Sequence, residues 1–295
     1  MLRRFALLLA LLPLIAACGS DAAGGSDTPK IVATTTQLAD IAQNIAPGAH
    51  VTSLLKANTD PHDYEVRPND VKALASADIV LRSGGEVDEW LDSALDSAGV
   101  DEQDVVDAGA AAGMEGDDPH WWQDPQRAER AAVAIGAAFA RAGLPDDSAA
   151  YVKRLQALDA GVKRCIDQVP PAQRKLVTSH DALGYYARRY GIEVIGTVIP
   201  ALTTAAQPSA GDVAKLVDTI KAAGVTTIFA ESSVNPKVEE AVAREAGARI
   251  GKELWADSLG PEGSDGASYI ASVESNTRAL VDGFSGGAVD CPLDA

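Results

Sequence analysis

Hydrophobic and polar residues follow one another along this chain in a pattern that predicts strands alternating with helices. Short runs rich in β-branched residues predict strands at residues 30–35, 50–55, 78–84, 175–179, 192–199, 226–230 and 248–250. Apolar residues spaced three or four apart predict helices at residues 38–46, 68–77, 87–98, 125–142, 145–168, 182–190, 209–223, 235–246 and 266–284. Because strand–helix alternation is typical of parallel sheets with right-handed crossovers, the pattern predicts an α/β protein.

The predicted helix over residues 145–168 divides the chain into two similar halves. At 1.5 Å per residue it is roughly 35 Å long, and Pro170 and Pro171 end it. We therefore expect an α/β lobe at residues 30–144, a linker helix at 145–169 and a second α/β lobe at 170–295. Residues 107–119, which are small or acidic, are expected to form a loop.

The first residues indicate the compartment. Arg3 and Arg4 precede an apolar stretch at residues 5–17, which is too short for a comfortable membrane span and ends in Ala-Ala-Cys18. This pattern resembles a bacterial lipobox and predicts a lipoprotein signal peptide at residues 1–17, lipidation of Cys18 and a flexible tether at residues 18–29. The alternative is an ordinary secretory signal. The mature protein is expected on the extracytoplasmic face of the cell membrane.

Composition argues against nucleic acid as a partner and leaves open whether the chain has a disulfide. A formal charge of −17 and a pI near 4.5 argue against nucleic acid, whose binding requires Lys and Arg at phosphates. Besides Cys18, the chain has Cys165 and Cys291. An oxidising compartment permits a disulfide between them, although sequence cannot show whether they pair. Thiolate metal ligation is the weaker alternative, because neither cysteine has a CxxC partner.

Three of the four histidines lie in settings that favour metal binding. His62 and His120 each follow an Asp-Pro pair, and His180 ends an apolar run; His50 lies in an ordinary predicted strand and is left out. All three follow predicted strands, and ligands of open α/β sheets bind beyond the carboxyl ends of strands. Three imidazoles suit a borderline metal such as zinc and leave one position for a carboxylate.

Asp257 is the preferred fourth ligand, and Glu231 is its competitor. The Asp residues before proline, Asp60, Asp118 and Asp124, are also typical of turns. The acidic residues ahead of His120 are expected to form a solvated entrance, outside the coordination sphere. Spacings of about sixty residues between the histidines match no compact motif such as HExxH.

With these residues in view, the chain resembles the zinc- or manganese-binding solute-binding proteins of ABC importers (the ZnuA-like or lipoprotein-adhesin family, periplasmic solute-binding protein family 9). The resemblance covers nearly the whole mature chain. Four segments carry it: Asp60-Pro61-His62-Asp63-Tyr64-Glu65 with Pro68-Asn69-Asp70, Asp118-Pro119-His120-Trp121-Trp122-Gln123-Asp124-Pro125, Thr178-Ser179-His180-Asp181-Ala182-Leu183-Gly184-Tyr185-Tyr186, and Asp257-Ser258-Leu259-Gly260.

The resemblance implies a monomeric, non-enzymatic protein with two α/β lobes, one long linking helix and a metal site in the cleft between the lobes. The implied ligands are His62, His120, His180 and Asp257, with Glu231 near the cleft but not coordinating. The implied partners are the permease and ATPase subunits of a metal importer, to which the protein would deliver its cargo.

Zn²⁺ is the expected cargo, because manganese-selective members of this family usually have Glu where this chain has His180. Manganese or iron is the alternative cargo. The chain lacks the long His-rich loop of many zinc members. A secreted zinc hydrolase would need an open metal position, which Asp257 would close. A cell-adhesion role, attributed to some relatives, has no support in this sequence.

Overall fold

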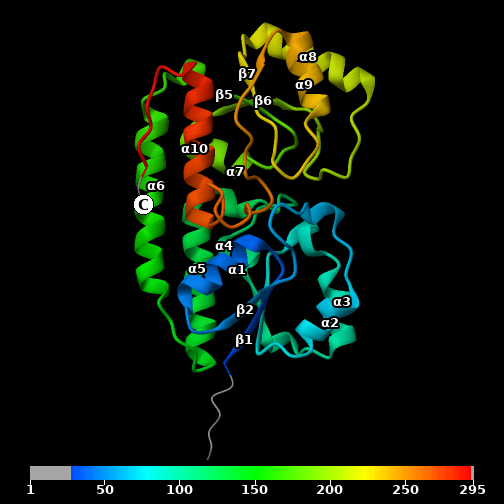
Figure 1. The fold of residues 1–295 in the computed structure, drawn as a ribbon, viewed down its shortest axis with the longest axis vertical. Coiled ribbons are helices and arrows are strands. Elements are labelled where there is room, and N and C mark those ends of the chain that lie inside the picture. The colour runs from blue at the N-terminus through cyan, green and yellow to red at the C-terminus, as the bar shows by residue number, and fades with distance from the viewer. Residues whose placement is uncertain (1–27, 294–295) are drawn as a thin grey trace, which may run out of the picture.

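The computed structural model describes residues 28–293, so the predicted signal peptide and Cys18 lie outside the described residues. Within that range the chain builds two stacked α/β lobes with three long helices beside them (Figure 1). The first lobe is the part built on strands β1 to β4, and the second lobe is the part built on β5 to β8. No helix among residues 28–293 has the length and apolar character needed to cross a membrane.

The first lobe has one parallel four-stranded sheet in the order β2-β1-β3-β4. Its central strands are buried because their β-branched residues face helices on both sides. The strands are β1 (Lys30–Ala33), β2 (His50–Ser53), β3 (Ile79–Arg82) and β4 (Val105–Asp107). The α-helices are α1 (Thr36–Ile45), α2 (Pro68–Leu74), α3 (Leu91–Ala98) and α4 (Ala108–Ala112). The 3-10 turns are η1 (Pro61–Asp63), η2 (Gly85–Asp88), η3 (Glu102–Asp104) and η4 (Trp121–Gln123).

The second lobe repeats this strand order. Two parallel pairs, β5-β6 and β7-β8, are joined where the Phe229 amide donates to the Val177 carbonyl at 3.0 Å, which gives the spatial order β6-β5-β7-β8. The strands are β5 (Lys175–Thr178), β6 (Glu193–Thr197), β7 (Thr227–Ile228) and β8 (Arg249–Ile250). The other elements are η5 (Pro171–Gln173), α7 (Gly184–Tyr190), α8 (Ala210–Ala223) and α9 (Lys237–Ala246). The parallel α/β fold is thus confirmed.

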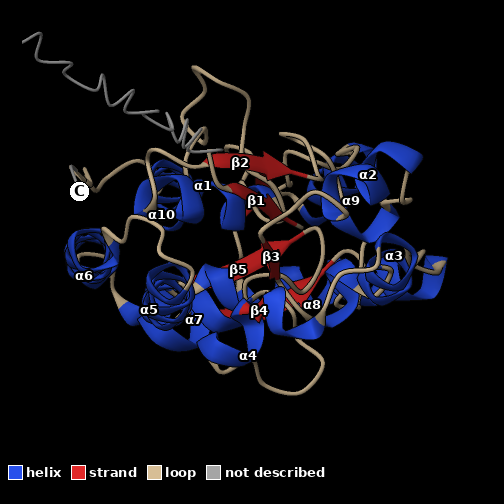
Figure 2. Cartoon of the chain, turned by 90° about the horizontal axis from the view of Figure 1, so that it is seen from below, coloured by secondary structure: helices blue, strands red, loops and turns tan. Residues whose placement is uncertain are grey.

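Three long helices flank the lobes (Figure 1): α5 (Pro125–Arg141) lies beside the first lobe, α10 (Tyr269–Ser285) lies beside the second, and α6 (Ser148–Asp167) runs along both. α6, the predicted linker, has 20 residues and so spans about 30 Å. Seen from below, these helices lie on one side of the strands, with α2, α3 and α9 on the other (Figure 2). The linker is therefore supported along its length by α5 and α10 and does not stand alone.

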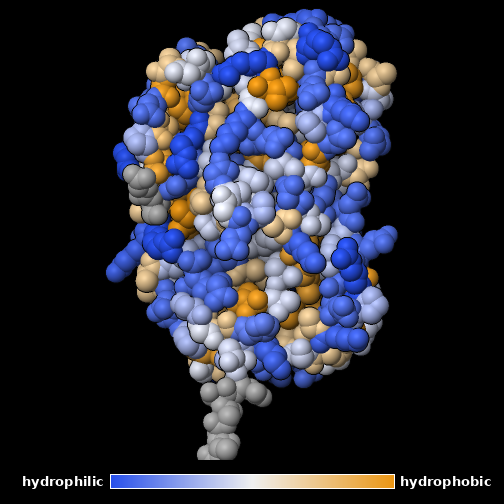
Figure 3. Space-filling model, in the orientation of Figure 1, coloured by the Kyte–Doolittle hydropathy of each residue, from blue (hydrophilic) through white to orange (hydrophobic). Residues whose placement is uncertain are grey.

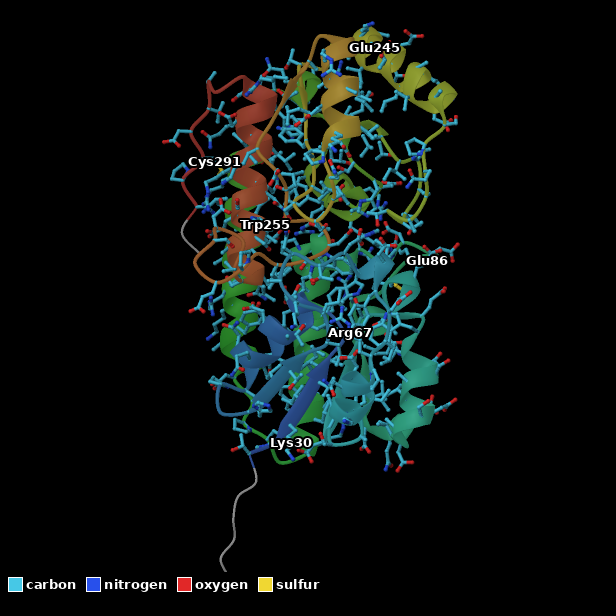
Figure 4. The ribbon with its side chains drawn as sticks, turned by 45° about the vertical axis from the view of Figure 1, so that its right-hand side comes forward. Lys30, Arg67, Glu86, Glu245, Trp255 and Cys291 are labelled. Carbon is cyan, nitrogen blue, oxygen red and sulfur yellow. A yellow bond between two sulfur atoms is a disulfide. The ribbon has the colours of Figure 1, made fainter. Side chains whose placement is uncertain are left out.

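A disulfide joins Cys165 in α6 to Cys291 near the C-terminus, with 5.3 Å between the two Cα atoms. Cys291 lies beside the helices that flank the lobes (Figure 4). Both side chains are almost fully buried. The bond fixes the segment after α10 to the linker helix.

Two local predictions were wrong. The segment 107–119 is not all loop: Val105 and Val106 begin β4, and Asp107 caps α4 by accepting a hydrogen bond from the Ala110 amide. The expected helix at residues 87–98 is divided into η2 and α3. Alanines and glycines in α4 give no periodic apolar signal, which is why the sequence pattern missed this short helix.

Candidate metal centre

His62 and His120 are presented by the same local device. In each case the Asp two residues earlier accepts a hydrogen bond from the histidine amide, at 3.0 Å for Asp60 and 3.1 Å for Asp118. Proline between the two residues restricts φ, and a 3-10 turn begins at Pro61 or directly after His120. The repeated Asp-Pro-His sequence therefore gives two stiff loops that hold imidazoles at set angles.

Asp118 does more than close a turn. Its Oδ1 also lies 2.9 Å from Nδ1 of His120, so the ring donates that proton to the carboxylate and turns Nε2 inward. We predicted Asp118 as part of a solvated entrance, and the structure corrects this, because the carboxylate contacts a buried imidazole. The signal was present in the Asp-Pro-His spacing, although the spacing alone does not show which ring nitrogen the carboxylate reaches.

Glu231 holds His180 in the same way from the second lobe. Oε1 accepts the His180 amide at 3.1 Å and Oε2 lies 2.7 Å from its Nδ1. Glu231 follows β7 and pairs with Leu254 in an isolated parallel bridge, so the sheet itself fixes its position. The structure therefore places Glu231 behind His180, where it orients the ring, and not among the inward-facing donor atoms.

The loop with Asp257 comes from the second half of the chain but packs on the first lobe. The Ala256 carbonyl accepts hydrogen bonds from Trp122 Nε1 at 2.9 Å and Gln123 Nε2 at 2.7 Å. The Asn58 amide donates to the Leu259 carbonyl at 2.9 Å. The loop lies between α10 and the first lobe in Figure 1, and Figure 4 shows Trp255 near the level where the lobes meet. The Asp257 loop, which belongs to the predicted second lobe by sequence, is therefore held in place by the first lobe.

The four predicted side chains converge. Donor atoms of His62, His120, His180 and Asp257 all lie within 4.8 Å of one another. Asp257 lies 3.6 Å from His62 Nε2, 3.5 Å from His120 Nε2 and 3.2 Å from His180 Nε2. His120 Nε2 and His180 Nε2 are 3.3 Å apart.

The cluster is buried, and several of its polar atoms lack a hydrogen-bond partner among the described residues. The four side chains are at most 1% exposed. Both ring nitrogens of His62 and both carboxylate oxygens of Asp257 are buried without a hydrogen-bond partner among the described residues. Such burial is costly for polar groups unless a ligand compensates it. The residues therefore fit a small cation bound by three nitrogens and one oxygen.

Burial and neighbouring charges shift the two coupled imidazoles in opposite directions. Burial lowers the pKa of His120 to about 3, against the attraction of Asp257. Burial would also lower the pKa of His180, but Glu231 and Asp257 together outweigh it and raise that pKa to about 10. At neutral pH the metal-free cluster therefore has an uncharged His120 beside a protonated His180.

The surface where the two lobes meet, here called the seam, includes a contact near His120. The Tyr185 hydroxyl in α7 accepts from the Glu115 amide at 2.7 Å and donates to the Asp118 carbonyl at 3.0 Å. The guanidinium carbons of Arg127 and Arg188 lie 4.3 and 4.6 Å from the centre of the Tyr185 ring. The loop before His120, which we expected to be a solvated entrance, is thus fastened to the second lobe at Tyr185, and its Glu115 pairs with Arg127 and Arg188.

Comparison with known families supports the architecture and the cluster together. Residues 31–283 match the family model described as the periplasmic zinc-uptake complex component A (ZnuA). The match includes all four cluster residues and nearly the whole described chain.

Curated relatives bear names of three different metals. The manganese-binding lipoprotein MntA of Bacillus subtilis is 35% identical, covering 89% of this chain and 92% of that protein. The zinc-binding protein TroA of Treponema pallidum is 33% identical, covering 90% and 92%. The iron-binding protein YfeA of Yersinia pestis is 31% identical, covering 88% of each chain.

The solved structure of the Treponema pallidum periplasmic zinc-binding protein TroA superimposes with a TM-score of 0.78 at 28% identity, covering 87% of this chain and 99% of that one. The expectation of a binding protein without enzymatic activity agrees with this family. The chain belongs to the ZnuA family of metal-binding substrate-binding proteins of ABC transporters.

Proposed function

We propose that this protein binds one Zn²⁺ through His62, His120, His180 and Asp257 and delivers it to the permease of an ABC importer. The observation that carries the proposal is the buried convergence of these donors within 4.8 Å, with unpartnered atoms on His62 and Asp257. A single ion would satisfy the Asp257 carboxylate and one of the two unpartnered ring nitrogens of His62.

The donor set favours zinc over manganese. Three imidazole nitrogens and one carboxylate suit a four-coordinate borderline metal, whereas manganese prefers more oxygen donors. Asp118 and Glu231 support coordination through nitrogen, because each binds the Nδ1 proton of a histidine and leaves Nε2 for the metal. Manganese or iron remains the second candidate cargo, since the relatives MntA and YfeA are named for those metals.

The setting of the protein follows from the same proposal. We place it as a monomer on the extracytoplasmic face of the cell membrane, held by a lipid on Cys18, with lobes at residues 30–144 and 170–295 and a linker at 145–169. Its partners are the permease and ATPase subunits of the importer. The names of MntA and of other relatives include the word lipoprotein, which supports the lipid anchor.

Calorimetric titration of metal-free protein with Zn²⁺, Mn²⁺ and Fe²⁺ tests the proposal. We expect one ion per chain, with zinc the tightest. His120→Ala and His180→Ala each remove a nitrogen donor and should weaken zinc binding by at least a hundredfold. His50→Ala is the matched control, because His50 is exposed and lies outside the cluster.

Two results would contradict the proposal at different levels. Wild-type affinity in both His120→Ala and His180→Ala would overturn the ligand assignment. Tighter binding of manganese than of zinc would keep the site but change the cargo.

A further inference from the structure

The buried cluster raises the question of how a cation reaches it. The four side chains are at most 1% exposed, so an ion must cross the seam between the lobes. The seam at Tyr185 is closed by hydrogen bonds, and the side chains of Arg127 and Arg188 cover the Tyr185 ring while they pair with Glu115. Most of the surface in Figure 3 is hydrophilic, so polarity alone does not mark a route.

A pocket of about 520 Å³ lies on another part of the seam. Its first-lobe wall is Asp60 and Asp63, which flank His62, and its second-lobe wall comes from the segments 198–208 and 233–239. The Thr204 hydroxyl donates to Asp60 Oδ2 at 2.6 Å across the seam. The pocket thus borders the loop that presents His62 and the segment that follows Glu231.

The pocket contains a buried carboxylate that the fold does not satisfy. Glu239 in α9 is 3% exposed, and its Oε2 has no hydrogen-bond partner among the described residues. The Ser233 hydroxyl, also in the pocket wall, is buried without a partner in the same part of the structure. A buried, unpartnered carboxylate oxygen is costly unless a donor or cation comes to it.

The charged side chains of the pocket indicate which kind of ligand it attracts. The pocket is lined by three acidic side chains, Asp60, Asp63 and Glu239, and by one basic side chain, Lys237. Among residues 28–293, the His62 cluster is the one group of three or more His, Cys, Asp or Glu side chains close enough to hold a bare ion. The pocket carboxylates are therefore too far apart to coordinate a bare ion directly, but the volume accommodates an ion with its water shell.

We propose that this pocket is a vestibule that captures the hydrated divalent cation before it reaches the histidines, with Glu239 as its main attracting group. The inference rests on the proposed metal-binding function and adds the route of access to it. Acidic clefts with low-dielectric walls concentrate cations and raise association rates by roughly 10 to 1000-fold. Glu239 supplies the main part of that attraction on the seam between the lobes.

Stopped-flow measurement of Zn²⁺ association and chelator-induced dissociation tests the vestibule. We expect Glu239→Gln to lower the association rate constant roughly fivefold at low ionic strength. Because the vestibule lies on the path in both directions, dissociation should slow by a similar factor and the equilibrium constant should change less than about twofold. The control is Glu240→Gln, since Glu240 is exposed on the same helix and outside the pocket.

Lys237→Gln provides the second, opposite variant. Removing the basic side chain should accelerate zinc association, and this change remains decisive if Glu239→Gln does not fold. Unchanged association rates in the folded variants, or a slowing in Glu240→Gln equal to that in Glu239→Gln, would overturn the vestibule. Failure of the wild type to bind any divalent ion would instead overturn the proposed function, so the two failures are distinguishable.

Discussion

Zinc binding should release a proton from His180 well above the pH at which an ordinary histidine is neutral. The imidazole of His180 lies between Glu231 and Asp257, which raise its pKa to about 10 despite burial. At pH 8 the metal-free protein therefore has a proton on Nε2, the nitrogen that faces the cluster. Coordination requires that lone pair, so the proton must leave. His120, whose pKa burial lowers to about 3, has no such proton to release.

The magnitude follows from linkage. One proton released per ion makes apparent zinc affinity rise about tenfold for each pH unit, and this slope should persist from pH 6.5 to about 10. An unperturbed histidine would give no slope above about pH 7.5. Stability of the metal-free protein changes in the opposite sense. The pKa of His180 is higher in the folded than in the unfolded protein. Its contribution to the free energy of unfolding is therefore complete below pH 6.5 and is lost as pH rises toward 10.

Calorimetry at pH 8 in buffers of different ionisation heat measures this release. The apparent enthalpy plotted against buffer heat should have a slope near one proton per zinc. Glu231→Gln removes the carboxylate that contacts His180 Nδ1, lowers the pKa of His180 and should reduce the slope toward zero. Glu245→Gln, on an exposed position of α9, is the control. A wild-type slope of zero at pH 8 would refute the claim that the two carboxylates keep His180 protonated.

Three further changes test the packing around the site. Gln123→Ala removes the 2.7 Å hydrogen bond to the Ala256 carbonyl and should lower the free energy of unfolding by about 1–3 kcal/mol. The melting temperature should fall more in the zinc-bound protein than in the metal-free protein. Gln126→Ala, at an exposed position, should have little effect. Reduction of the disulfide, which spans 126 residues, should lower the free energy of unfolding by up to about 5 kcal/mol in denaturant titrations with and without reductant. Gly109→Ala would place a Cβ 2.1 Å from the Ser83 carbonyl oxygen and should destabilise by about 1–3 kcal/mol in the same titration.

Much of the fold could be predicted from local pattern, because long periodic segments indicate helices and β-branched runs indicate strands. The linker helix, the strand–helix alternation of a parallel α/β protein and the capping box at Ser209 and Asp212 are of this kind. The order of the strands in each sheet was not predicted. Short elements were harder. β4 and α4 follow each other directly and together occupy only residues 105–112, and alanine and glycine carry little information about which side faces the core.

The candidate site divides in the same way. The Asp-Pro-His sequences could be recognised locally, and the fold then brought His62 and His120 together. The attachment of the Asp257 loop could not be predicted, because it depends on hydrogen bonds from Trp122 and Gln123 to Ala256, which lies more than 130 positions later in the chain. No sequence pattern of either segment indicates the other. Asp118 was underestimated for a related reason, since turn formation and ring orientation use the same side chain.

The attachment of the Asp257 loop also determines when the first lobe can be completed. A chain that emerges from its N-terminus can form β1 to β4 early, but the surface around Trp122 and Gln123 stays unfinished until the loop at residues 255–260 arrives. Cys165 must likewise wait for Cys291. Early intermediates should therefore expose an incomplete seam, and a chain truncated before residue 255 should lack a metal site even though the sheet of its first lobe is complete.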